Sequence, residues 1–136
     1  MDAETAQRFL TDQHRAVMAT YRSDGRPQMS PVGAGVDAEG RVIVSSSEGT
    51  AKVRNLRRDP RVSLCVLHES FYGPWLQVDG RADIVALPDA MEPLVEYYRR
   101  LSGEHPDWDD YRRAMERERR VLIRIAMERA TELQRV

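Results

Sequence analysis

Residues 16–46 read AVMATYRSDGRPQMSPVGAGVDAEGRVIVSS, and this stretch decides the fold class. It contains three runs rich in apolar and β-branched residues, which lie at 16–22, 27–36 and 41–46. The pair Asp24–Gly25 separates the first two runs and is a strong signal for a tight β-hairpin turn. A second turn, at residues 37–40, leads into the third run. The stretch therefore predicts three strands that follow one another as an antiparallel meander.

The rest of the chain predicts three more strands and four helices. The expected strands lie at residues 61–67, 75–85 and 120–127, and the residues after 127 either extend the last strand or fray. The expected helices lie at residues 4–13, 88–101 and 107–117, with a further one that begins near Ser47 or Thr50 and ends before Pro60. Gly80 interrupts one strand and indicates a bulge, a barrel corner or a division into two strands. Because strands and helices do not alternate as βαβ units, we expect a mainly β fold: one domain over residues 1–136, an antiparallel barrel of six to seven strands with inserted and flanking α-helices.

Composition argues against several functional classes. The formal net charge of -1 provides no basic field for nucleic acid. No apolar run approaches the roughly 18–20 residues that cross a bilayer, and the first residues are acidic where a signal peptide is basic, so we expect a cytoplasmic protein without a membrane partner. The three histidines are too widely spaced for a metal site, and no Gly-x-Ser-x-Gly motif indicates a hydrolase. Cys65 is expected to be a small buried residue of a strand.

Lys52 is the one residue whose type stands out. It is the only lysine among 21 basic residues, and it lies at the start of the helix that follows Ser45 and Ser46. Free N–H groups, hydroxyls and a compact cation at a helix start suit a phosphate group. For the arginines that follow, the alternative interpretation is a solvated helix face, and a nucleic-acid contact is a weaker one. Trp75 has two interpretations as well, a wall for a planar ring or a core residue.

Four motifs together resemble the pyridoxamine-phosphate-oxidase-like split-barrel family, most of all its actinobacterial F420-dependent branch. They are Ala19-Thr20, Asp24-Gly-Arg-Pro-Gln-Met-Ser30, Lys52-Val-Arg-Asn-Leu-Arg-Arg-Asp-Pro-Arg61 and Gly103-Glu-His-Pro-Asp-Trp-Asp-Asp-Tyr-Arg112. The resemblance implies a split β-barrel that forms a homodimer, with two cofactor sites at the subunit interface. It also implies hydride transfer between coenzyme F420 and a planar conjugated small molecule. The alternatives are an FMN-dependent enzyme of the same fold, or a protein that binds or carries F420, a flavin or a tetrapyrrole without turnover.

The resemblance also assigns the expected cofactor contacts. Along the ring system and its hydrogen-bonding edge it places Gln28, Ser30, Pro31, Val32, Val44, Ser45 and Ser46. At the phosphate it places Lys52 and Asn55 with help from Thr50, and from the partner chain it brings Trp75 and Gln77. Thr50 stands where close relatives often carry an arginine, and Arg54 would compensate if it turned inward. No catalytic side chain is assigned, because the chemistry needs positioning more than an acid or base.

Overall fold

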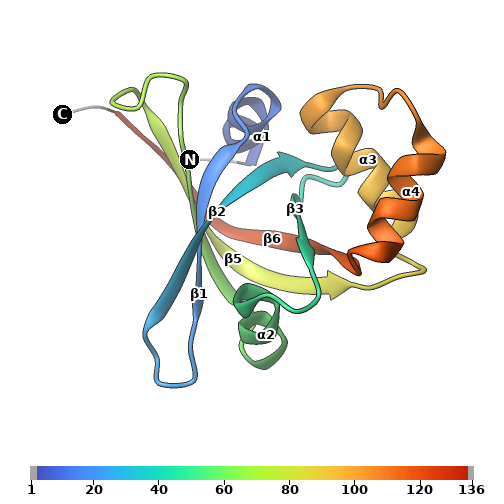
Figure 1. Ribbon diagram of the computed structural model, residues 1–136. Coiled ribbons are helices and arrows are strands. Elements are labelled where there is room, and N and C mark those ends of the chain that lie inside the picture. Colours follow the sequence, from blue (N-terminus) through green and yellow to red (C-terminus); the bar gives the residue numbers. More distant parts are fainter. Residues whose placement is uncertain (1–2, 135–136) are drawn as a thin grey trace.

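The computed structural model describes residues 3–134, which form six strands and four helices (Figure 1). The strands are β1 (Arg15–Tyr21), β2 (Pro27–Val36), β3 (Val42–Ser47), β4 (Arg61–Val66), β5 (Trp75–Val85) and β6 (Arg120–Leu133). The helices are α1 (Ala3–Asp12), α2 (Ala51–Arg58), α3 (Met91–Ser102) and α4 (Trp108–Arg117). The expected mainly β fold with inserted and flanking helices is therefore confirmed.

The six strands close into one antiparallel barrel in the order β1-β2-β3-β6-β5-β4. Side chains alternate across each strand, so every second residue points into the barrel. The inward residues form an apolar core, for which Met18, Val44, Leu64, Val78 and Ile123 are examples. Closure gives every strand two neighbours and leaves no exposed sheet edge over most of the wall.

The wall is incomplete in one place, between β2 and β3. Their ladder holds only the pairs from Ala34↔Val44 to Val36↔Val42. Residues 27–33 of β2 pair with β1 alone, and residues 45–47 of β3 pair with β6 alone. The two strands thus diverge and leave a split in the barrel, with α2 following directly from the diverging end of β3.

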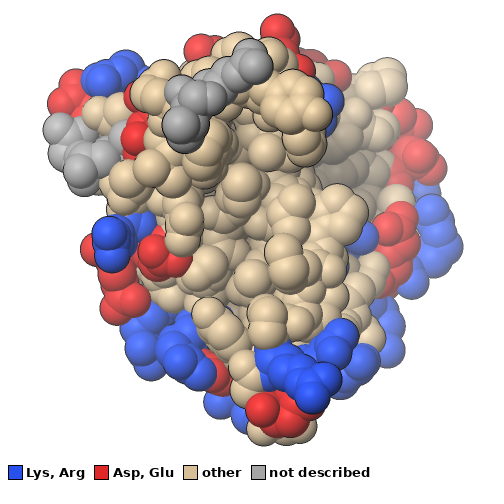
Figure 2. Space-filling model, turned by 90° about the vertical axis from the view of Figure 1, so that its left-hand side faces the viewer, with Lys and Arg blue, Asp and Glu red and all other residues tan. Residues whose placement is uncertain are grey.

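The helices cover the barrel unevenly (Figure 1). Helix α1 lies at one end of the barrel and α2 at the other, where Val53 and Leu56 join the core. Helices α3 and α4 pack on the outer face of β2, β3 and β6, around Ile43 and Leu122. The opposite side is turned to the viewer in Figure 2 and shows a broad surface with few charged side chains.

The structure corrects one expected boundary. Helix α3 begins at Met91, because residues 87–90 form a turn that Met91 N–H closes on the Pro88 carbonyl. Pro88 and Asp89 therefore lie outside the helix. Strand β6 continues to Leu133 along the whole of β5, so the residues after 127 extend the strand, which is one of the two outcomes that the sequence left open.

Gly80 lies at a bulge, as one of the sequence interpretations expected: the β5–β6 register shifts between Asp79 and Gly80. A side chain at Gly80 would run into the backbone carbonyl of Ala126. Gly80→Ala should therefore push β5 from β6 and lower the free energy of unfolding by about 1–3 kcal/mol. Chemical denaturation followed by tryptophan fluorescence measures this loss.

The matched control is Gly49→Ala, because a β-carbon there would meet no atom within 4 Å. Its unfolding free energy should stay within about 0.5 kcal/mol of the unsubstituted protein. Equal stability of the two variants would contradict the close approach of β5 and β6.

Candidate functional site

A buried hydrogen-bond network forms the floor of the split. The Asn55 amide of α2 donates to the Thr20 hydroxyl at 3.1 Å, and this hydroxyl donates to Gln28 Oε1 at 3.4 Å. Arg58 donates to the remaining Asn55 oxygen at 3.1 Å. Asn55 is only 7% exposed, so its amide ties α2 to β1 and β2. The expected contact between Asn55 and a phosphate stays a prediction, and it competes with these internal bonds.

The expected ring contacts do not share one face. On β2, Gln28, Ser30 and Val32 alternate with Pro31, which points outward. On β3, Val44 is fully buried in the barrel core, so only its backbone is left to meet a ring. Ser46 points inward and is 2% exposed, with its hydroxyl 2.9 Å from that of Thr50.

Ser30 offers the split a polar group that could bind a ligand. Its hydroxyl is buried and has no hydrogen-bond partner among residues 3–134. Ser30 lies on the part of β2 that pairs with β1 alone. The other edge of β2 is therefore free here and faces the split. A buried hydroxyl without a partner costs about 1–3 kcal/mol, and a polar ring edge placed in the split would remove that cost.

Lys52 lies in the first turn of α2 and is half-buried. Within the described part of the chain no carboxylate forms an ion pair with its ammonium. Burial lowers the pKa of Lys52, and the positive charge of Arg120 lowers this pKa further. Two cations therefore face one region without a local acid to neutralise Lys52, which is the electrostatic setting of an anion site.

Arg120 is a site residue that sequence reasoning missed. The guanidinium donates to Ser45 Oγ at 3.1 Å and to Ser47 Oγ at 3.2 Å, and it lies 3.6 Å from Glu118. Its position depends on the β3–β6 register, which places it opposite Ser47. Nothing local in the sequence signals that register, because 73 residues separate the two partners.

The other cations near α2 are engaged elsewhere. Arg54 is exposed and donates to the Gly49 carbonyl at 2.7 Å, so it does not turn inward as expected. Arg57 pairs with Glu48, and Arg61 pairs with Asp59. Arg61 lowers the pKa of Asp59 to about 2, chiefly through its side-chain hydrogen bond. Arg57 and Arg61 are thus surface cations paired with acids, as the solvated-face interpretation expects. The Thr50 hydroxyl donates to the Ser47 carbonyl.

Trp75 and Gln77 lie outside the split of their own chain. Both are on the outer face of β5, with Trp75 half-buried and Gln77 exposed. This face belongs to the uncovered side of the barrel seen in Figure 2. A contact with the split of another subunit is compatible with this position and stays a prediction.

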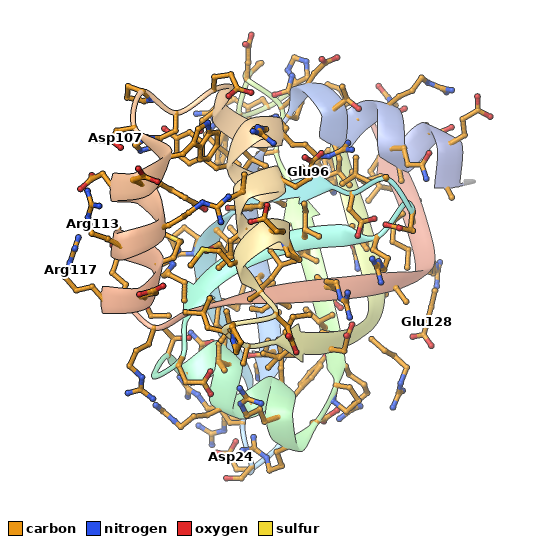
Figure 3. All side chains as sticks on the ribbon, turned by 90° about the vertical axis from the view of Figure 1, so that its right-hand side faces the viewer. Asp24, Glu96, Asp107, Arg113, Arg117 and Glu128 are labelled. Carbon is orange, nitrogen blue, oxygen red and sulfur yellow. The ribbon has the colours of Figure 1, made fainter. Side chains whose placement is uncertain are left out.

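A cavity of about 360 Å³ adjoins the split between β3 and the α3–α4 pair. Tyr97, Leu101, His105 and Met115 line it, and Ser45 and Arg120 bound it on the barrel side. Figure 3 shows this side of the molecule, with Arg113 and Arg117 of α4 pointing away from the barrel. The cavity therefore has aromatic and apolar walls, with Arg120 as its one cation and Asp110 and Glu118 as its acids.

Metal ligands and membrane-spanning helices are two further features that the described residues could have contained. Residues 3–134 contain no group of three or more potential metal ligands. None of the helices described is long and apolar enough to span a membrane.

The family described as pyridoxamine 5'-phosphate oxidase matches residues 3–134 of this chain. The chain belongs to this family. The features at the split that could hold a cofactor are the free edge of β2, the unpartnered Ser30 hydroxyl and the cations at Lys52 and Arg120.

Several known proteins are similar to this member of the family. The F420H(2)-dependent biliverdin reductase of Mycobacterium tuberculosis is 30% identical over 129 residues, which cover 93% of this chain and 85% of that protein. A conserved hypothetical protein of Mycobacterium tuberculosis has a solved structure with a TM-score of 0.79 and 25% identity, covering 98% of this chain and 85% of that one. A solved F420 reductase has a TM-score of 0.70 at 23% identity, covering 92% and 94% of the two chains, and this likeness concerns the fold. Family and relatives together support an oxidoreductase with a flavin or deazaflavin cofactor.

The absence of any other lysine makes the charge of Lys52 directly measurable. NMR titration of its side-chain CH₂ resonance should give a pKa below the ordinary lysine value, because the ammonium is half-buried beside Arg120. In Arg120→Ala this pKa should rise but stay below the ordinary value, since burial is the larger cause. A pKa of Lys52 that does not respond to the Arg120 substitution would contradict the shared site.

Proposed function

We propose that this protein is an F420-dependent oxidoreductase that transfers a hydride between the deazaflavin and a planar conjugated small molecule. The observation that carries the proposal is Lys52, a half-buried cation without an ion-pair partner in the described chain, at the diverging end of the split. The similarity to an F420H(2)-dependent reductase at 30% identity supports the same cofactor. Such a cofactor supplies the hydride, and the protein positions it and keeps water away.

The residues present fit such a cofactor at both of its ends. The unpartnered Ser30 hydroxyl and the free edge of β2 offer hydrogen bonds to a polar ring. Lys52 and Arg120 offer positive charge to a phosphate, and charge-assisted hydrogen bonds are about twice as strong as neutral ones. Arg120 thus takes the compensating role that the sequence suggested for Arg54.

F420 is favoured over FMN by the space beyond Arg120. A second cavity, of about 330 Å³, is lined there by Arg57, Arg119 and Arg120 with Glu48 as its one acid. F420 carries a longer anionic tail than FMN, and an excess of positive charge suits that tail. FMN shares the phosphate and the tricyclic ring, and it stays the alternative.

The cavity beside α3 and α4 is the proposed site of the acceptor. Its walls include Tyr97, Tyr98 and His105, whose rings suit a flat conjugated molecule. Ser45 borders both this cavity and the split, so an acceptor there lies next to the proposed position of the ring. Proximity of the two reactants in a site that excludes water accounts for most of the rate enhancement such a site needs.

Substitution of the lysine tests the cofactor site. Lys52→Ala should weaken F420 binding by about 1.5–3 kcal/mol, roughly 10- to 150-fold in Kd, because a charged hydrogen bond to the phosphate is lost. Quenching of F420 fluorescence measures the affinity. Thermal stability should not fall, because the substitution removes a half-buried charge without a counter-ion in the described chain.

Arg61→Ala is the matched control, since it removes one exposed cation that pairs with Asp59. Its Kd for F420 should stay within about twofold of the unsubstituted protein, as expected for an exposed ion pair. No saturable F420 binding at micromolar protein, or purified protein that is yellow with FMN, would count against the F420 assignment. Binding without oxidation of reduced F420 by a panel of quinones, enones and nitroaromatics would favour a carrier.

We also propose that the uncovered side of the barrel holds a second copy of the chain. It presents half-buried Val17 and Cys65, exposed Met29 and half-buried Trp75, and Figure 2 shows few charges across it. An apolar surface of this kind favours association. A second copy seated there would bring Trp75 and Gln77 toward a neighbouring split, as the family resemblance implies.

A charge in the middle of this face tests the association. Val17→Glu should convert a dimer to a monomer in sedimentation velocity, because a carboxylate would be buried without a partner. F420 binding should weaken in the same variant. Thr11 is exposed on α1, so Thr11→Glu should leave the dimer intact. A monomeric unsubstituted protein at micromolar concentration would refute the association.

A further inference from the structure

The hydroxyl of Tyr97 lies between β2 and β3 at the point where their ladder ends. Tyr97 donates to the Gly33 carbonyl at 2.8 Å. The backbone N–H of Ser45 is close enough to the phenol oxygen to lower the pKa of Tyr97 by hydrogen bonding, against the larger effect of burial. The last pair of the ladder is Ala34↔Val44, so Gly33 and Ser45 are the next two residues in its register. The phenol therefore occupies the place of the direct hydrogen bond that would extend the ladder.

The orientation of the backbone groups on β2 agrees with this position of the phenol. The Ala34 N–H turns toward β1 and donates to the His14 carbonyl at 2.7 Å. Because N–H and C=O groups alternate between the two sides of a strand, the Gly33 carbonyl faces β3. A phenol donates one hydrogen bond and accepts another, so the hydroxyl satisfies both strands at once.

Gly33 gives the phenol the space it needs. A β-carbon at this position would lie 2.9 Å from the Tyr97 hydroxyl and 3.0 Å from Leu101, so any larger residue pushes these two side chains of α3 away from β2. Burial raises the pKa of Tyr97, so the hydroxyl keeps its proton at neutral pH and remains a donor. The bridge from β2 through α3 to β3 thus consists of Gly33, Tyr97 and Ser45.

We propose that Tyr97 is a positioning residue that holds β2 and β3 apart and sets the width of the cofactor cleft. Its role in binding rests on the proposed function, whereas its role in the split concerns the protein alone. Ser45 also accepts a hydrogen bond from Arg120, so a shift of Ser45 carries the cationic end of the site with it. Loss of the hydroxyl leaves the Gly33 carbonyl and the Ser45 N–H without this partner. Strands β2 and β3 then shift until both groups form other hydrogen bonds.

The test removes the hydroxyl and keeps the ring. In Tyr97→Phe without cofactor, hydrogen exchange of the Ser45 amide, followed by NMR, should speed up about tenfold or more as its acceptor is lost. The Kd for F420 should rise roughly three- to tenfold, the range for one lost hydrogen bond. Gly33→Ala should produce both changes as well, since it pushes the phenol away from the strands.

Tyr111→Phe is the matched control. The Tyr111 hydroxyl is buried and donates to the Leu94 carbonyl at 2.7 Å, but it links α4 to α3 away from the ladder. Its removal should lower the melting temperature as much as Tyr97→Phe does. Ser45 exchange and the Kd for F420 should stay within about twofold of the unsubstituted protein, since the bridge is intact.

Two results would overturn the proposal. One is Ser45 exchange that is the same in Tyr97→Phe and in the unsubstituted protein, because the phenol then does not bridge the strands. The other is an unchanged Kd in a variant whose Ser45 protection is lost, because the bridge then does not shape the cleft. If the unsubstituted protein binds neither F420 nor FMN, the proposed function fails, and Ser45 exchange alone decides whether Tyr97 holds the split open.

Discussion

The early end of the β2–β3 ladder is the constraint on which the rest of the structure depends. After Ala34↔Val44 the strands separate, and the backbone of β2 keeps a free edge that it would not have if its ladder with β3 continued. The same divergence leaves the Ser30 hydroxyl without a partner and sends the chain from β3 directly into α2. A longer ladder would close the wall, satisfy the edge and remove the cleft.

Much of the fold could be predicted from local signals, because local signals determine turns and strand periodicity. Asp24–Gly25 and the run of β-branched residues after it predicted β1 to β3 to within one or two residues, and Gly80 indicated the bulge. The start of α3 was wrong, since proline and aspartate suit a turn as well as the first turn of a helix. Here residues 87–90 form a turn that the Met91 N–H closes on the Pro88 carbonyl.

Residues of the candidate site could be selected from the sequence only where residue type carried the information. Lys52 was selected because it is a lone lysine among arginines. Arg120 was missed, because only the β3–β6 register brings it to Ser45 and Ser47. Tyr97 was missed for a related reason: an aromatic residue at helical spacing indicates core packing, and nothing in the sequence places its hydroxyl between two strands. The side-chain hydrogen bonds from Asn55 to Thr20 and from Arg54 to the Gly49 carbonyl could not be predicted from the sequence either.

The energetics of Lys52 connect folding to binding. Its ammonium loses part of its hydration when the protein folds, and no carboxylate in the described chain compensates for that loss. The cost is therefore already present in the free protein, so an arriving anion meets a cation that is partly dehydrated and held in place. Preorganisation of this kind strengthens binding because less free energy is lost on association. A site built on a strand edge, one bridging phenol and two cations needs no acid–base pair, which suits chemistry in which the cofactor supplies the hydride.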